Sequence, residues 1–287
     1  MGSAEALKNV KSIVESQPEG SATIVVVSAL GGVTNQLLAM VDLALEHNKE
    51  YETILEAMRQ RHYDVAAAVV PENRLEECRT TLEQFLESLA SFYQFLDLNQ
   101  DTADHFKHLL SDAIVNNGEV LSSIIVTCML DGSTPHFSPN FIKTTETPDG
   151  RKADFDTTMR LIAEEWKGGV NGVHVTQGFI ASDSRDEKRE TNLGRGGSDF
   201  TAALIAATLD AECLEIWTDV DGFMTADPRK DPTATVIDEM TYEQAQIMCD
   251  AGAKVIYPPT IAPVANKKIP VWVKNTFNPT ARGTVIK

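Results

Sequence analysis

A glycine-rich stretch directly before a helix-like segment is the strongest chemical signal in the chain. It reads NLGRGGSD over residues 192–199, and the apolar pattern of residues 200–209 follows it. Glycines let backbone amides approach an anion closely, and a helix start adds free N–H groups and a positive dipole end. Arg195 can hold a carboxylate or a phosphate with two hydrogen bonds. We therefore expect an anion site here; the alternative is that Ser198 or Asp199 merely caps the helix.

The stretch differs from the two common glycine-rich nucleotide motifs. A dinucleotide fingerprint, GxGxxG, would need glycine where Asp199 stands, and the chain contains no GxxxxGK[ST] phosphate loop. The expected anion site is therefore of another type.

A second group of polar residues follows the apolar run of residues 214–218. The chain continues as TDVDG over residues 218–222 and as DPR over residues 227–229. A carboxylate such as Asp219, at a strand end beside a phosphate loop, suits contacts with a nucleotide or Mg²⁺, and Arg229 could neutralise phosphate. The alternative is an Asp-Gly turn and an Asp-Pro turn with solvated charges.

Two further positions could place polar groups at the mouth of a sheet. Glu119 stands before a largely apolar run, within the sequence NGE, and could meet an ammonium group. Ser28 and Thr34 follow an apolar run and could meet a carboxylate. The structural alternatives are a first-turn helix acid for Glu119 and a helix cap for Thr34.

Charge is unevenly distributed along the chain. The 287 residues carry 25 basic and 42 acidic side chains, a formal net charge of −17, which excludes a general nucleic-acid binder. Residues 254–287 nevertheless hold six basic residues and no acidic one, so an anionic ligand finds its best counter-charge near the C-terminus. Lys254 opens this tail and could lie over a phosphate; the alternative is a surface lysine without a specific role.

The composition, 43% apolar and 23% charged, indicates a folded protein with a sizeable core. Four cysteines have neither CxxC nor metal-ligand spacing, so we expect reduced thiols that act as small buried hydrophobes in a cytoplasmic protein. The charged N-terminus is unlike an export signal, and polar residues interrupt the uncharged stretch of residues 21–41. We expect no membrane partner.

The elements that must position these residues follow from periodicity. Residues 37 to about 115 show apolar side chains at three- and four-residue spacings, typical of helices. Strands alternating with helices predict a three-layer α/β/α sandwich with a mainly parallel sheet, in which ligands bind at the carboxyl ends of strands. We expect one unit with two lobes, approximately residues 1–175 and 176–287. The short apolar runs expected among the strands are residues 24–27, 124–128, 173–180, 214–218 and 271–273.

Taken in order, the motifs resemble those of the aspartokinase family, within the amino-acid kinase superfamily, over nearly the whole chain. LGRGGSD followed by TDVDG and DPR is highly specific, since kinases for glutamate, acetylglutamate, carbamate or uridylate share the fold but not this set. The matching stretches are VVSALGGVTNQL (26–37), NGEVLS (117–122), QGFIASD (177–183), TNLGRGGSDFTAALIAATL (191–209), WTDVDGFMTADPR (217–229), GAKVIYPPTIAPV (252–264) and IPVWVKNTFNPTARGTVI (269–286).

This resemblance implies an amino-acid kinase fold and ATP-dependent phosphorylation of the β-carboxylate of L-aspartate, the first step towards lysine, threonine and methionine. It implies aspartate in the N-terminal lobe, and ATP with Mg²⁺ in the C-terminal lobe. The residues implied to hold aspartate are Thr34, Glu119, Arg195, Gly196, Gly197 and Ser198, with Arg195 on the α-carboxylate and Glu119 near the amino group. Those implied at the nucleotide are Thr218, Asp219, Met224, Arg229, Lys254 and Val255, and catalysis is expected of Asp199 and Lys254.

The chain departs from the family pattern in three places. Members begin with a strand and a KFGGTS-type loop, whereas this chain begins with MGSAEAL, which resembles the helix after that loop; we therefore expect ligand binding with little turnover. Met224 stands where many relatives have an aromatic residue, and Tyr257 and Pro259 replace a histidine and an arginine. No regulatory or dehydrogenase domain is expected.

Two alternatives stay open: a kinase of the same fold with another acid substrate, and a binding module without catalysis. A homodimer also stays open.

Overall fold

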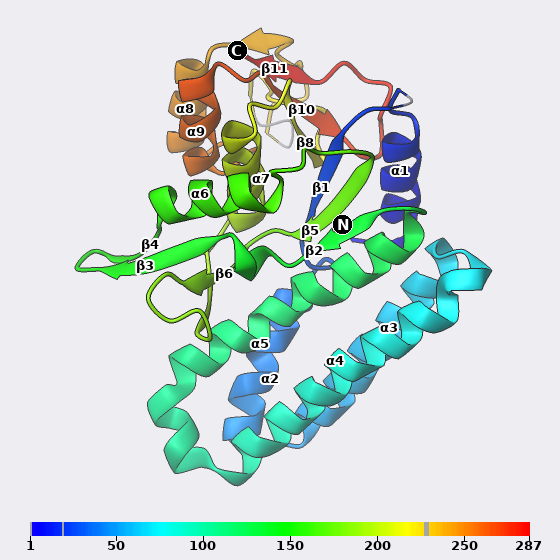
Figure 1. Ribbon diagram of the computed structural model, residues 1–287, viewed down its shortest axis with the longest axis vertical. Coiled ribbons are helices and arrows are strands. Elements are labelled where there is room, and N and C mark those ends of the chain that lie inside the picture. Colours follow the sequence, from blue (N-terminus) through cyan, green and yellow to red (C-terminus); the bar gives the residue numbers. More distant parts are fainter. Residues whose placement is uncertain (1, 19, 227–229) are drawn as a thin grey trace.

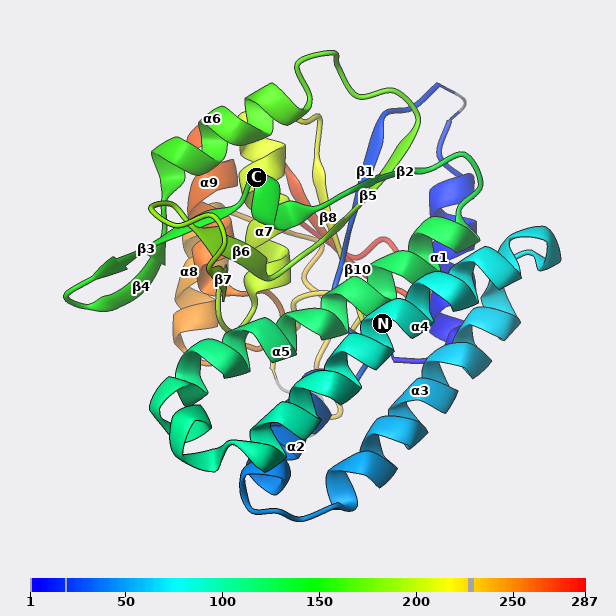
Figure 2. The same ribbon diagram turned by 60° about the horizontal axis from the view of Figure 1, so that its bottom comes forward.

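The computed structural model describes residues 2–18, 20–226 and 230–287, with the side chains of residues 100–110 outside that description. Its central strands lie between two groups of helices, while one hairpin projects from the side of the molecule (Figures 1 and 2). Helix α1 (Ala4–Glu15) opens the chain, and its N-cap Ser3 accepts a hydrogen bond from the backbone N–H of Ala6 at 3.2 Å. Strand β1 (Thr23–Val27) follows and enters the centre of the molecule.

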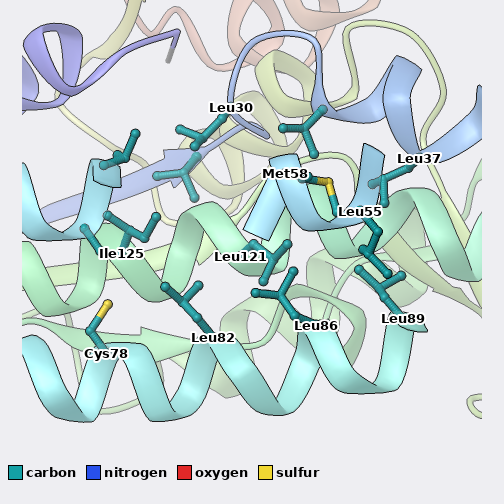
Figure 3. Packing of buried hydrophobic residues seen from close by; sticks show 14 of the residues in the cluster. Leu30, Leu37, Leu55, Met58, Cys78, Leu82, Leu86, Leu89, Leu121 and Ile125 are labelled. Atoms are coloured by element: carbon teal, nitrogen blue, oxygen red, sulfur yellow. The ribbon is translucent and has the colours of Figure 1, made fainter. Parts of the chain in front are cut away.

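Four long helices form the block that the periodicity predicts. Val70 is extended before Pro71, as a residue before proline must be, and this break separates α3 from α4. Figure 3 shows Leu82, Leu86 and Leu89 of α4 pointing toward side chains of α3 and α5. The four helices are α2 (Val33–Leu45), α3 (Glu50–Val69), α4 (Glu72–Leu98) and α5 (Gln100–Met129).

The prediction of a strand over residues 124–128 is wrong. These residues form the last turns of α5, a helix of 30 residues. Ile125, Val126 and Cys128 are buried, because α5 packs against other helices on one side and against strands on the other. A short apolar run inside a helix enclosed on several sides has the same composition as a buried strand, so periodicity cannot separate them.

The strands form three hydrogen-bonded sheets. In the first, β5 (Val173–Gln177) lies between β1 and β2 (Thr134–His136), and both pairs are parallel. The second has the order β8-β10-β11-β9, and the third β4-β3-β6-β7. Their members are β8 (Leu214–Thr218), β9 (Glu239–Met240), β10 (Val271–Asn275) and β11 (Thr284–Ile286), and β3 (Lys143–Thr147), β4 (Gly150–Ala153), β6 (Ile180–Asp183) and β7 (Glu190–Asn192).

Strand β1 shows why helices cover both sides of the first sheet. Val25 and Val27 pack with the core of α2 to α5, whereas Ile24 and Val26 pack with a core that helices α6 and α7 share with β6. Alternate side chains of a strand point to opposite faces, so an apolar strand needs cover on both. The expected α/β class with layered helices is confirmed. The second group of helices is α6 (Phe155–Glu165), α7 (Gly197–Thr208), α8 (Tyr242–Asp250) and α9 (Ile261–Lys267).

Helix α7 contributes side chains to two hydrophobic cores. Phe200 and Leu204 belong to the core shared with α6, while Ala203 and Ala206 belong to the core of α8, α9 and the second sheet. The segment that begins with the glycine-rich stretch is thus held from two sides.

All four cysteines are free thiols, as expected. Cys213 is exposed, so the expectation that every cysteine is buried is wrong for this one. Among the helices of the described residues, none has the length and apolar character needed to cross a bilayer.

Candidate active site

Two neighbouring parallel strands end at the same edge of the first sheet. Val27 of β1 lies opposite Gln177 of β5, and the Gly178 N–H donates to the Val27 carbonyl at 2.8 Å. The loop after β1 leads to α2. The loop after β5 passes so close to the start of α7 that a Cβ on Gly178 would lie 2.5 Å from the Cβ of Ser198. The carboxyl end of β5 therefore lies beside the carboxyl end of β1, and the loop that follows β5 lies against the start of α7.

Both helices begin without a side-chain cap. Their N-caps are Gly32 and Gly196, which adopt left-handed conformations with φ of 85° and 72°. Glycine takes this conformation without the steric cost that a Cβ would bring. The capping alternatives for Thr34, Ser198 and Asp199 are therefore wrong, because these residues follow the caps inside the first turn. Two positive helix ends remain open to an anion.

The glycine-rich stretch presents one cation. Arg195 is exposed, lies between two glycines with positive φ, and has no ion-pair partner among the described residues. Gly197 is buried, whereas Ser198 is half-buried. An unpaired guanidinium beside a helix start is well suited to a carboxylate or a phosphate.

Glu119 lies deep in the interior of α5, so the first-turn alternative is wrong. Its side chain is buried, at 5% exposure, and Oε1 accepts a hydrogen bond from the Ala29 N–H at 3.2 Å. Its second oxygen, Oε2, is buried and has no hydrogen-bond partner among the described residues. Burial raises the pKa of Glu119 to about 7, although the hydrogen bond from Ala29 acts in the opposite direction. A buried acceptor without a donor is costly, which indicates a place for a donor from a ligand.

Asp199 connects the glycine-rich stretch with the beginning of the basic tail. Its Oδ2 accepts a hydrogen bond from the Tyr257 N–H at 3.3 Å. Burial raises the pKa of Asp199, and the hydrogen bond from Tyr257 opposes that rise. The Tyr257 ring covers Gly196, where a Cβ would lie 2.3 Å from the ring's Cγ. Lys254 is three residues away in the chain, exposed, and without an ion-pair partner among the described residues.

The other described residues expected at the nucleotide lie on or beside the second sheet. Thr218 and Asp219 stand at the end of β8, and Met224 forms an isolated antiparallel bridge with Val236. Val255 is half-buried and packs beside the core of the second sheet. Arg229 lies outside the described residues. Within the part of the chain that the structure describes, no hydrogen bond joins Thr218, Asp219 or Met224 to Lys254 or to the glycine-rich stretch.

Sequence reasoning missed Tyr257 as a contact of Asp199, and it missed two polar residues on α5, Asp112 and Asn116. Tyr257 is 58 residues from Asp199 in the chain, and nothing in the pattern announces that contact. For α5 a signal existed, because residues 112, 116 and 119 have helical spacing and share one face of the helix.

The described residues contain no group of three or more His, Cys, Asp or Glu side chains that could hold a metal ion. The described residues therefore do not suit a metal site whose ligands all come from the protein. Mg²⁺ commonly binds through one or two carboxylates with phosphate oxygens and water as its other ligands. Asp219 is the carboxylate expected at the nucleotide, and Asp199 is the one expected near the reacting carboxylate of the substrate. The arrangement provides a buried anion, an exposed cation and two positive helix ends, which together suit a zwitterionic amino acid beside a phosphate.

Comparison with known proteins agrees with these features. The family model described as "Amino acid kinase family" matches residues 1–275. Lysine-sensitive aspartokinase 3 of Escherichia coli (strain K12) is 34% identical over 273 residues, which cover 93% of this chain and 58% of that protein. A bifunctional aspartokinase/homoserine dehydrogenase of Buchnera aphidicola is 30% identical over 296 residues, 100% of this chain and 35% of that protein.

Among solved structures, E. coli aspartokinase III in complex with aspartate and ADP (R-state) has a TM-score of 0.84 at 31% identity. The similarity covers 99% of this chain and 62% of that one. The same enzyme in complex with lysine and aspartate (T-state) has a TM-score of 0.81 at 29% identity. This chain thus spans less than two thirds of the length of each of these relatives.

Proposed function

The chain belongs to the amino acid kinase family, and on this basis we propose that it transfers the γ-phosphoryl group of ATP to the β-carboxylate of L-aspartate, forming 4-phospho-L-aspartate. The observation that carries the proposal is the buried, unpaired Oε2 of Glu119. An α-ammonium group offers the donors and the positive charge that this oxygen lacks. The complex of E. coli aspartokinase III with aspartate and ADP supports the choice of ligands.

In the proposed complex, the two ends of the substrate's amino-acid group are recognised by opposite charges. Glu119 binds the α-ammonium, and Arg195 binds the α-carboxylate with its planar guanidinium. Gly196, Gly197, Ser198 and Thr34 surround the anionic groups through the first turns of α7 and α2. This leaves the β-carboxylate directed to the phosphate.

The reaction demands positioning more than proton transfer. A carboxylate with an ordinary pKa near 4 is already ionised at pH 7, so its attack on the γ-phosphorus needs no general base. A new bond forms between the carboxylate oxygen and phosphorus, the bond from phosphorus to the bridging oxygen breaks, and ADP leaves. The protein must align two anions and offset their repulsion. We assign this offset to Lys254 and to the amides at the start of α7, with Asp199 organising the loop that carries Lys254.

For the nucleotide we propose the C-terminal part of the chain, residues 176–287, and for aspartate the part up to residue 175 together with the glycine-rich stretch. Thr218, Asp219, Met224, Arg229, Lys254 and Val255 are the proposed lining. The acid-free tail from residue 254 supports this assignment, because it supplies the positive charge that a triphosphate needs. Mg²⁺ bound with ATP would neutralise phosphate charge.

The test combines calorimetric binding with a coupled phosphoryl-transfer assay. We expect the wild type to bind L-aspartate and ATP, and to release ADP with aspartate but not with glutamate or N-acetylglutamate. Arg195→Ala should weaken aspartate binding roughly ten- to a hundredfold, the cost of a charge-assisted double hydrogen bond, and leave ATP affinity unchanged. Arg79→Ala, which removes an exposed arginine on α4, is the matched control.

Transfer to glutamate or N-acetylglutamate in preference to aspartate would overturn the substrate assignment. Binding of both ligands without any ADP release would instead establish a binding module.

A further inference from the structure

One face of α5 connects the ammonium-binding residue to the loop that carries the carboxylate-binding residue. Asp112, Asn116 and Glu119 have the spacing i, i+4, i+7, which places them along one side of the helix. Glu119 faces the loop after β1. Asp112 and Asn116 instead contact β7, the strand that runs into the glycine-rich stretch.

Asp112 contacts Asn192, the first residue of the glycine-rich stretch. The Asn192 side-chain amide donates to Asp112 Oδ1 at 2.9 Å, while Asn192 Oδ1 accepts from the Gly194 N–H at 3.2 Å. One asparagine thus ties α5 to the backbone immediately before Arg195. The second oxygen of Asp112 pairs with Arg151 Nη2 at 2.7 Å, so both carboxylate oxygens are engaged.

Arg151 holds Asp112 from a third element. It stands on β4 of the β3–β4 hairpin, which projects from the body of the molecule (Figures 1 and 2). Its Nε also pairs with Glu146 of β3 at 3.3 Å, and its side chain is only 21% exposed. Asn116 adds a second tie, because its amide donates to the Thr191 carbonyl and to Glu190 Oε2, both at 3.1 Å.

A loop with left-handed glycines on both sides of Arg195 has high conformational entropy when it is unrestrained. The ties on its N-terminal side come from the same helix that carries Glu119. We propose that Asp112, with Asn192 as its intermediary, is a positioning residue that fixes the backbone before Arg195 relative to the helix that carries Glu119, so that Arg195 and Glu119 can bind the α-carboxylate and the α-ammonium of one amino acid together. This inference rests on the proposed function, because it assigns both groups to Arg195 and Glu119.

The test is a double-mutant cycle read by calorimetric affinity. Asp112→Ala should lower the affinity for aspartate roughly tenfold, through misplacement of Arg195, and leave ATP affinity unchanged. In the Arg195→Ala background, Asp112→Ala should lower the aspartate affinity almost no further, because Asp112 acts on binding through Arg195. Asn192→Ala removes the same tie without disturbing the pair of Arg151, and it should reproduce the loss if Asp112→Ala folds poorly.

Asp149→Ala is the matched control. It removes an 80% exposed aspartate from the turn of the same hairpin, where its one ion pair among the described residues is with Lys152 at 3.1 Å. We expect wild-type affinity for this variant. An equal loss of affinity from Asp112→Ala with and without Arg195 would show that the residue acts through general stability, and unchanged affinity in both Asp112→Ala and Asn192→Ala would overturn the proposal outright.

Failure of the proposed function gives a different pattern. If the wild type binds glutamate and not aspartate, the substrate assignment is wrong, and the same cycle with glutamate decides the positioning role. A wild type that binds neither amino acid overturns both.

Discussion

The backbone N–H of Ala29 donates to Glu119 Oε1 at 3.2 Å and leaves Glu119 Oε2 buried without a partner. This one contact joins the loop after β1 to the interior of α5, across 90 positions of sequence. One carboxylate oxygen is thus hydrogen-bonded, and the other is left for the α-ammonium group of the proposed substrate. Because a buried charge without a full set of partners destabilises the folded protein, binding and stability should oppose each other here.

Glu119→Gln should therefore stabilise the ligand-free protein and abolish aspartate binding. The pKa of Glu119 rises from 4.5 to about 7, which corresponds to about 3 kcal/mol between its two protonation states. Since the raised value belongs to the folded state, this residue's stability contribution is present below pH 4.5 and is lost as pH rises through about 7. At pH 8 the variant should melt at a higher temperature than the wild type, and near pH 4.5 the two should converge.

Glu212→Gln, which neutralises an exposed acid, is the control for the change in net charge and should leave the melting temperature almost unaltered. A lower melting temperature for Glu119→Gln at pH 8 would contradict the account of the buried charge.

The affinity for aspartate should itself depend on pH. Only ionised Glu119 attracts an ammonium group, so affinity should fall as pH drops below about 7, by up to tenfold per pH unit. Binding at pH 6 should release a proton, because the ammonium favours the ionised carboxylate. Calorimetry in buffers of different ionisation enthalpy measures this release. An absence of proton release at pH 6 in a wild type that binds aspartate would refute the assignment of Glu119.

Much of this site is visible in the sequence because it is local. The stretch NLGRGGSD predicts a loop and a helix start, and α7 begins at Gly197 within it. Glu119 and Arg195 could be singled out because their charges stand beside an expected strand end or helix start, and Lys254 because it opens the tail without acidic residues. Each of these positions can be recognised from its own residue type and from the residues near it in the chain.

Contacts between distant segments leave no such signal. Tyr257 contacts Asp199 across 58 positions of sequence, and Asp112 contacts Asn192 across 80 positions. Residues 124–128 show the converse, since an apolar run has no periodicity of its own and only the helices around α5 determine its conformation. The division of the strands into three sheets likewise depends on pairing, which composition does not encode.

Gly196→Ala should be more harmful than Gly194→Ala, although both glycines have nearly the same φ, 72° and 74°. At Gly194 an added Cβ meets nothing within 4 Å, so only the left-handed backbone is penalised, by about 1–2 kcal/mol. At Gly196 the Cβ would also lie 2.3 Å from Cγ of Tyr257. Urea unfolding should show the larger loss for Gly196→Ala, and Tyr257→Ala should relieve part of it. Equal losses at the two glycines would show that the Tyr257 contact does not restrict this position.

His62 should make the folded protein sensitive to acid. It is fully buried in α3, and its Nδ1 lies 2.7 Å from the Met58 carbonyl, so Nδ1 carries the donated proton and Nε2, which has no partner, carries the lone pair. Burial lowers the pKa of His62, and the hydrogen bond to Met58 opposes this effect only in part. A histidine that stays neutral when folded but takes up a proton when unfolded favours the unfolded chain as pH falls below about 6.5.

Between pH 7 and pH 5 the unfolding free energy of the wild type should therefore fall more steeply than that of His62→Leu, by up to about 1.4 kcal/mol per pH unit. Both proteins share the titration of the acidic surface, so it cancels when their two slopes are compared. Parallel slopes would mean that protonation of His62 costs no free energy in the folded protein.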